Sequence, residues 1–139
     1  MRTFPARSPA IQVEGLVYFG RMLDKIRAND RGELPAEYQP NLGKGFDGEC
    51  CEFLGIDYSA VVAQVRAGKS DEEILARCRT EGKPRSERDV FVWNEFMRKR
   101  GWDDDVAPML EKRKREANLS ERSEIRTMFQ FIDADEGRL

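Results

Sequence analysis

Three charged residues in the segment 9–28 have the types and spacing best suited to recognition chemistry: Arg21, Asp24 and Lys25. At 100° per residue they fall together on one side of a helix, within an arc of about 100°. Two cations beside one carboxylate suit an anionic ligand, with Asp24 orienting both cations. The alternative is a solvated helix face, on which an i, i+3 ion pair contributes a few tenths of a kcal/mol.

Four more residues complete the set of candidate ligand-binding positions. Arg27 falls on the apolar side of the same helix, where a charge must snorkel or find a partner. Asn94 lies between apolar positions of a later helix, so it either locks a helix crossing or contacts a ligand. Its neighbour Trp93 is a core anchor or a stacking platform, and Tyr38 lies in a long segment that packs onto the helices.

Histidine, which carries much of enzyme chemistry, is missing from the sequence. The chain has three cysteines, Cys50, Cys51 and Cys78. The absence of histidine removes Ser–His and Cys–His nucleophile pairs and the usual zinc sites. We therefore expect no metal, no cofactor and three reduced, buried thiols. An enzyme is the alternative only through carboxylate or lysine acid–base chemistry, with Asp24 or Lys25 in a dry cleft beside the first helix.

Three short motifs resemble ligand-binding patterns but lack the necessary context. Gly43, Gly45 and Gly48 have the spacing of a dinucleotide fingerprint, yet no strand precedes them. The string 133–137 resembles a calcium loop whose glycine comes one position too early. The basic run 112–115 is offset by the acidic run 103–105, so we expect no nucleic-acid surface.

The elements that must position these residues are helices. Ser8 and Pro9 are typical of a helix start, and Ser70 with Glu73 forms a predicted capping box. The sequence predicts an all-α protein, a compact single-domain bundle of five to seven helices over residues 1–139, with one long central helix near the N-terminus. The predicted helices cover 9–28, 58–67, 70–82, 86–101 and 106–118, and the last begins at Ser120.

Two segments fall outside this helical pattern. Residues 1–7 are predicted to be a flexible or extended N-terminal arm. Residues 30–48 form a long loop with two prolines, several glycines and no helical period. Loops of this length are often functional. This one is either a packed connection or a lid over a site.

Composition and charge place the chain among globular proteins. Its 139 residues are 40% hydrophobic and 36% charged, with a net charge of −2, which fits one domain. The longest apolar run, 16–19, is far too short for a membrane span, and no secretory signal is visible. We therefore predict a soluble cytoplasmic protein. Phe131 lies away from the buried stripe of its helix and Phe91 at the edge of its own, which predicts an apolar patch for a homodimer, a third functional alternative.

An ordered set of short motifs resembles a known family. The motifs are Arg7-Ser8-Pro9, Leu23-Asp24-Lys25-Ile26-Arg27-Ala28, Phe53-Leu54-Gly55-Ile56-Asp57, Ser70-Asp71-Glu72-Glu73-Ile74, Trp93-Asn94 and Asp133-Ala134-Asp135-Glu136-Gly137-Arg138. Together they resemble the bacterial family catalogued as domain of unknown function 5069, from about residue 8 to residue 138. The resemblance implies a small bacterial protein and supplies no activity, substrate or partner. The expected function is a binding or interaction module, in which a charged cluster of the first helix lines a groove partly covered by residues 30–48.

Overall fold

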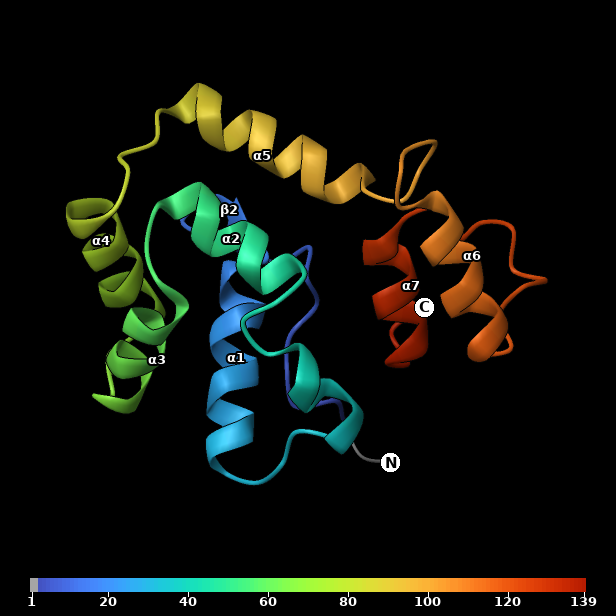
Figure 1. The fold of residues 1–139 in the computed structure, drawn as a ribbon, viewed down its shortest axis with the longest axis horizontal. Helices are drawn as coiled ribbons and strands as arrows, with labels where there is room; N and C mark the ends of the chain where they lie inside the picture. Colours follow the sequence, from blue (N-terminus) through green and yellow to red (C-terminus); the bar gives the residue numbers. More distant parts are fainter. Residues whose placement is uncertain (1–2) are drawn as a thin grey trace.

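The computed structural model describes residues 3–139 and is mostly helical (Figure 1). Within this range the chain forms seven α-helices, one 3₁₀ helix and one two-stranded sheet. The elements are β1 (Gln12–Val13), β2 (Leu16–Val17), α1 (Phe19–Asp30), η1 (Ala36–Asn41), α2 (Phe46–Leu54), α3 (Tyr58–Arg66), α4 (Asp71–Glu81), α5 (Glu87–Lys99), α6 (Ala107–Glu116) and α7 (Met128–Asp135). The helical class predicted from the sequence is confirmed, with the small sheet as an addition. None of the helices in the described range is long and apolar enough to cross a bilayer.

The first helix begins at Phe19, so the predicted start at Pro9 is wrong. A tight antiparallel hairpin takes the place of its first half, and β1 and β2 pair Val13 with Leu16. Glu14 and Gly15 both have positive φ at the turn, a conformation that glycine adopts without strain. At its twelve residues α1 is also shorter than α5 and is not the long helix expected.

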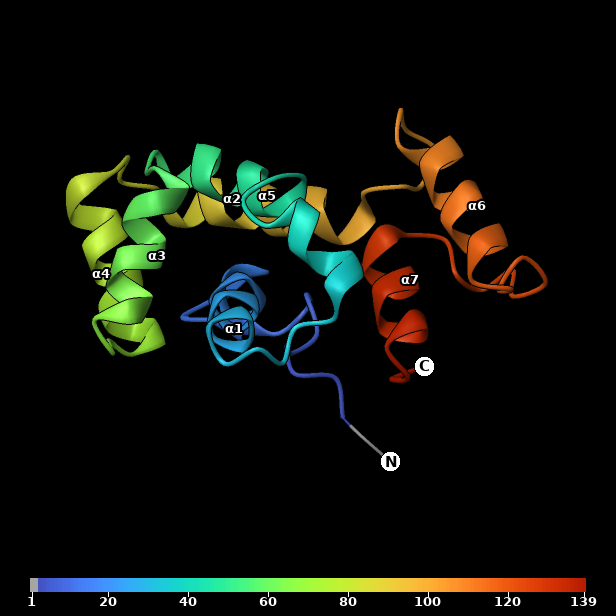
Figure 2. The same cartoon turned by 60° about the horizontal axis from the view of Figure 1, so that its bottom comes forward.

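Helix α1 nevertheless lies among the other elements, with eight of its twelve residues buried. Figure 2 shows it nearly end-on, with α3 and α4 on one side, α2 and α5 across the top and α7 on the opposite side. Phe19, Met22 and Leu23 are fully buried in the main core. The helix is therefore a rigid platform for any polar side chain that it carries.

Three helices begin at side-chain capping boxes. The box predicted at Ser70 and Glu73 is confirmed at α4, and Ser86 with Asp89 forms another at α5. The last helix begins at Met128 under a cap from Thr127, so the predicted start at Ser120 is wrong. The residues between α6 and α7 instead form a loop, which Leu119 and Ile125 fix to a second small core.

The second core contains Phe131, which contradicts its predicted outward position. Phe131 is 8% exposed and packs with Leu110 and Ile125. Phe91 is exposed as predicted and lies with Val92 and Phe96 among the exposed apolar residues of α5. Self-association through this face stays a prediction.

Residues 3–7 of the predicted arm and the 30–48 loop are packed against the helices. Residues 1–2 lie outside the described range, and residues 3–7 have no helix or strand. Ala6 is buried, and its carbonyl accepts a hydrogen bond from Arg138. The 30–48 segment contains η1 and the first residues of α2. It is therefore a folded connection between α1 and α2, because a 3₁₀ turn and a helix start satisfy much of its backbone.

Candidate functional site

Four charged residues of α1 form two groups on different sides of the helix. Asp24 and Arg27 lie in an ion-pair cluster with α4, whereas Arg21 and Lys25 line a cavity. The predicted arrangement, in which Asp24 orients Arg21 and Lys25, is therefore wrong. The cations of the second group find their carboxylates elsewhere in the chain.

Asp24 is held by two arginines and does not line the cavity. Arg7 donates from Nε to Oδ2 of Asp24 at 2.8 Å and from Nη2 to Oδ1 at 3.0 Å, and Arg27 lies 3.3 Å from Oδ1. Both arginines also pair with Asp71 of α4, each at 2.8 Å. Burial acts to raise the pKa of Asp24, but the hydrogen bonds and charges of Arg7 and Arg27 lower it below its usual value. This cluster fixes the N-terminal segment and α4 to α1.

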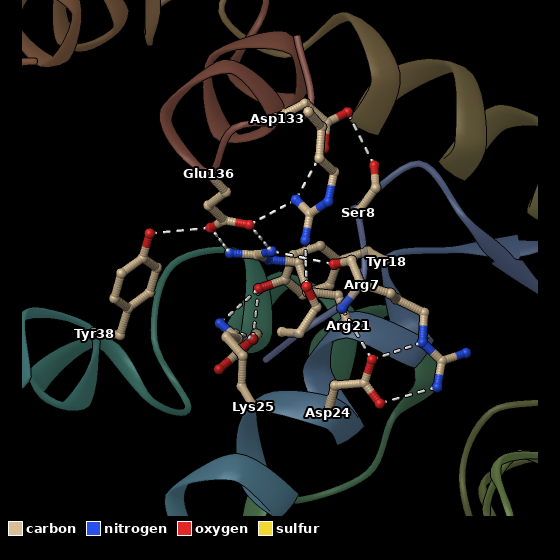
Figure 3. A network of polar contacts seen from close by, with 12 residues as sticks. Arg7, Ser8, Tyr18, Arg21, Asp24, Lys25, Tyr38, Asp133 and Glu136 are labelled. Atoms are coloured by element: carbon tan, nitrogen blue, oxygen red, sulfur yellow. Dashed lines mark hydrogen bonds and ion pairs between the residues drawn. The ribbon is translucent and has the colours of Figure 1, made fainter. Parts of the chain in front are cut away.

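Lys25 lies in a buried cluster with Tyr18 and Asp47; Figure 3 labels Lys25 and Tyr18. Its ammonium is 2.9 Å from Oδ1 of Asp47 and donates to the Tyr18 hydroxyl at 3.0 Å. Tyr18 in turn donates to Oδ1 of Asp47 at 2.6 Å, and the backbone N–H of Gly43 donates to Oδ2. Burial lowers the pKa of Lys25, and Asp47 offsets only part of that shift.

Arg21 joins α1 to the end of α7 through Glu136. Its Nη1 and Nη2 donate to the two carboxylate oxygens of Glu136 at 2.8 and 2.6 Å, and both side chains are almost fully buried. The hydroxyl of Tyr38 donates to Oε2 of Glu136 at 3.0 Å, and Arg138 donates to Oε1 at 2.7 Å. Figure 3 shows Glu136 between Arg21 and Tyr38. Four hydrogen bonds therefore occupy this carboxylate.

A cavity of about 480 Å³ lies beside these two clusters, between α1, the segment 37–46, α6 and α7. This volume is in the range of small-molecule sites. Its polar wall is formed by Tyr18, Arg21, Lys25, Tyr38 and Glu136, and its apolar wall by Phe46, Ala117, Met128, Phe131 and Ile132. Exposed charged side chains surround the mouth: Glu37, Lys44, Arg113, Glu116 and Asp135. Burial, then Glu136 and Glu37, raise the pKa of Asp135.

The candidates Trp93 and Asn94 lie away from this cavity. Trp93 stacks on Phe53 with ring centroids 4.7 Å apart and is 5% exposed. Asn94 accepts from the backbone N–H of Val17 at 3.1 Å and donates to the carbonyl of Gly15 at 2.7 Å. Asn94 thus locks the hairpin onto α5, which is the structural role that the sequence analysis left open. Of the seven candidates, the cavity brings together Arg21, Lys25 and Tyr38.

The three thiols are free and buried. Burial raises the pKa of Cys51 to about 12 and that of Cys78 to about 11, and raises the pKa of Cys50 well above its usual range. Since the thiolate is the reactive form, these groups are poor nucleophiles. In the described part of the chain, no three His, Cys, Asp or Glu side chains gather into a group that could hold a metal ion.

Sequence reasoning missed Asp47, Glu136 and Tyr18 as parts of the site. One signal was available: cations on a helix that is otherwise buried need carboxylate partners, because an unpaired buried charge is costly. That argument predicts that partners exist but not which of the 26 acidic residues they are. The choice depends on how the 37–46 segment and α7 fold onto α1.

Comparison with known proteins gives a family and no activity. Residues 3–138 match the family described as Domain of unknown function (DUF5069). A search of curated proteins finds no match. The match covers nearly the whole chain, so both clusters and the cavity lie within the matched region.

Proposed function

We propose that this chain, which belongs to the DUF5069 family of proteins of unknown function, binds a small polar molecule in the cavity beside α1. The observation that carries the proposal is the pair of buried cations, Arg21 and Lys25, in the wall of a cavity of about 480 Å³. Buried charges are costly to maintain, so their placement around a concave space is typical of a binding site. Recognition of this kind requires no histidine, metal or cofactor.

The location of the cavity supports the same proposal. Its lining comes from two parts of the molecule: α1 and the segment 37–46 on one side, and α6 and α7 on the other. Figure 1 shows that α5 runs from the α4 end of the molecule to the α6 end. Binding sites are common where two packed units meet, because side chains from both can converge on one ligand.

A substitution that fills the cavity tests this function. Ala117 lines the cavity at the end of α6, and we expect Ala117→Trp to occupy much of the space and weaken binding about tenfold or more, by steric exclusion. The measurement is ligand-observed NMR with a set of anionic, cationic and neutral fragments, at equal protein concentration. The matched control is Ala63→Trp, at an exposed position of α3. Fragments that bind the wild type and Ala117→Trp equally, or an absence of any bound fragment, would overturn the proposal.

A second candidate function, acid–base catalysis, is favoured by one observation on Lys25. Its pKa is lowered by burial, and its ammonium contacts the Tyr18 hydroxyl in the cavity wall. A lysine with a lowered pKa can exchange a proton near neutral pH more readily than an exposed one. Lys25 serves ligand binding equally well. Acid–base catalysis requires the pKa of Lys25 to be lowered, whereas binding does not.

A titration of the lysine side chains separates these two functions. We expect the Cε signal of Lys25, followed by ¹³C NMR, to titrate below the ordinary lysine value of about 10.4, because burial disfavours the ammonium form. Lys25→Met assigns the shifted signal. A Lys25 signal that titrates at the ordinary lysine value would remove acid–base catalysis as a candidate.

A further inference from the structure

We infer that the ligand of this cavity is a small monocarboxylate with an apolar body. This inference rests on the proposed function and adds the chemical class of the ligand. It follows from a count of hydrogen-bond donors and acceptors in the polar wall, from the balance of charge there, and from the apolar residues that line the same cavity.

The polar wall has unused donors. The Lys25 ammonium carries three N–H groups, and among described residues two partners take them, the Tyr18 hydroxyl and Asp47. The Arg21 guanidinium carries five N–H groups, of which three donate within the described chain, two to Glu136 and one to the carbonyl of Arg7. Both side chains are at least nine-tenths buried and line the cavity. Unused N–H groups on buried cations favour a ligand oxygen.

The buried carboxylates, in contrast, are occupied as acceptors. Glu136 accepts four hydrogen bonds, from Arg21 twice, from Tyr38 and from Arg138. Asp47 accepts from Tyr18 and from the backbone of Gly43 and also contacts Lys25. A ligand ammonium that enters the inner end of the cavity would therefore meet charged donors and few free acceptors. An acceptor-bearing group such as a carboxylate matches these donors better than an ammonium does.

The balance of charge limits the ligand to a single negative charge. Asp47 balances Lys25 and Glu136 balances Arg21, so the inner wall carries no large net charge. A dianion such as phosphate would bring a second charge into a partly dry space without a counterion. At the mouth the two cations, Lys44 and Arg113, are outnumbered by three acidic residues, Glu37, Glu116 and Asp135, so a second negative charge on the ligand would find no counterion there either.

The apolar part of the cavity lining accommodates the remainder of such a ligand. It consists of Phe46, Met128, Phe131 and Ile132, and three of these come from α7. An apolar body of about the size of a phenylethyl group would cover these side chains while its carboxylate reaches Lys25. The acidic residues at the mouth, Glu37, Glu116 and Asp135, would favour an amine instead, so the experiment must include one.

Two probes with the same apolar body test the charge preference. We expect 3-phenylpropionate to bind the wild type at least about tenfold more tightly than phenethylamine, as one charge-assisted hydrogen bond requires. The double variant Lys25→Met/Asp47→Asn removes both charges of the pair and leaves no lone buried ion. It should weaken 3-phenylpropionate about tenfold or more. The control Arg66→Met/Asp30→Asn neutralises an exposed pair and should leave its affinity unchanged.

The outcomes separate the ligand class from the proposed function. Binding of 3-phenylpropionate that is lost in Ala117→Trp and in the Lys25→Met/Asp47→Asn variant supports both. Phenethylamine that binds equally or more tightly, and is lost in Ala117→Trp, overturns the monocarboxylate and leaves the binding function standing. If Ala117→Trp leaves the binding of 3-phenylpropionate unchanged, the inference is overturned because the binding site is elsewhere. If neither probe binds, the inference is also overturned, and the fragment set then decides the function. Thermal unfolding of each variant confirms that it is folded.

Discussion

Replacing Asp47 with alanine is expected to lower the free energy of unfolding by about 3–5 kcal/mol. Asp47 is fully buried, and it is the partner of the Lys25 ammonium and of the Tyr18 hydroxyl. Its removal would leave a buried cation without a counterion, which costs far more than an exposed ion pair contributes. Since small domains are stable by about 5–15 kcal/mol, this single change would remove a large part of the total. Urea denaturation followed by circular dichroism measures it.

Two further variants isolate the role of the charge at Asp47. Asp30→Ala removes the same side chain from an exposed pair with Arg66, and its effect should stay within about 1 kcal/mol. The double variant Asp47→Ala/Lys25→Met should regain part of the stability lost in Asp47→Ala, because no unpaired ammonium remains. A double variant that is as unstable as the sum of the two single variants would contradict this explanation.

The second large effect is expected at Glu136. Glu136→Ala would leave the buried guanidinium of Arg21 unpaired and remove a contact between α1 and the end of α7. We expect a loss of about 3–5 kcal/mol in the free energy of unfolding. Glu124→Ala is the matched control, because Glu124 pairs with Arg122 in an exposed position and should contribute at most about 1 kcal/mol.

Hydrogen exchange shows whether Glu136 acts at the predicted place. In Glu136→Ala the exchange rates of the α7 amides should increase over the wild type by more than those of α3 and α4. The reason is that α7 loses a buried contact with α1, whereas α3 and α4 keep theirs. A uniform increase across all helices would mean that the substitution weakens the whole fold. It would then give no evidence for a specific link between α1 and α7.

The sequence predicted the features of the helices that depend only on neighbouring residues. The Ser70 and Glu73 capping box and the apolar periodicity of α5 need only neighbouring residues to be recognised, and both are confirmed. The start of α1 could not be found this way. Ser8 and Pro9 are typical of a helix start, but Asn94, far away in the sequence, bonds to Gly15 and Val17 and holds the segment as a hairpin.

The sequence predicted only part of the candidate site. Helical spacing placed Arg21 and Lys25 together on one face, and the cavity does contain both. Spacing also grouped Asp24 with them, yet Asp24 pairs with Arg7 and Arg27 instead. A helical wheel gives the direction of a side chain but not which distant segment packs there. Asp47 and Glu136 therefore became visible only in the folded chain.

The most direct test of the binding site is a methyl NMR titration with 3-phenylpropionate and, in a separate series, phenethylamine. Ile132 and Met128 line the cavity, whereas Ile74 and Met97 are fully buried in the main core. We predict that the acid shifts the methyl signals of Ile132 and Met128 in a saturable manner and leaves those of Ile74 and Met97 in place. If the acid leaves the signals of Ile132 and Met128 in place, no monocarboxylate of this kind binds in the cavity beside α1, and the inference is wrong.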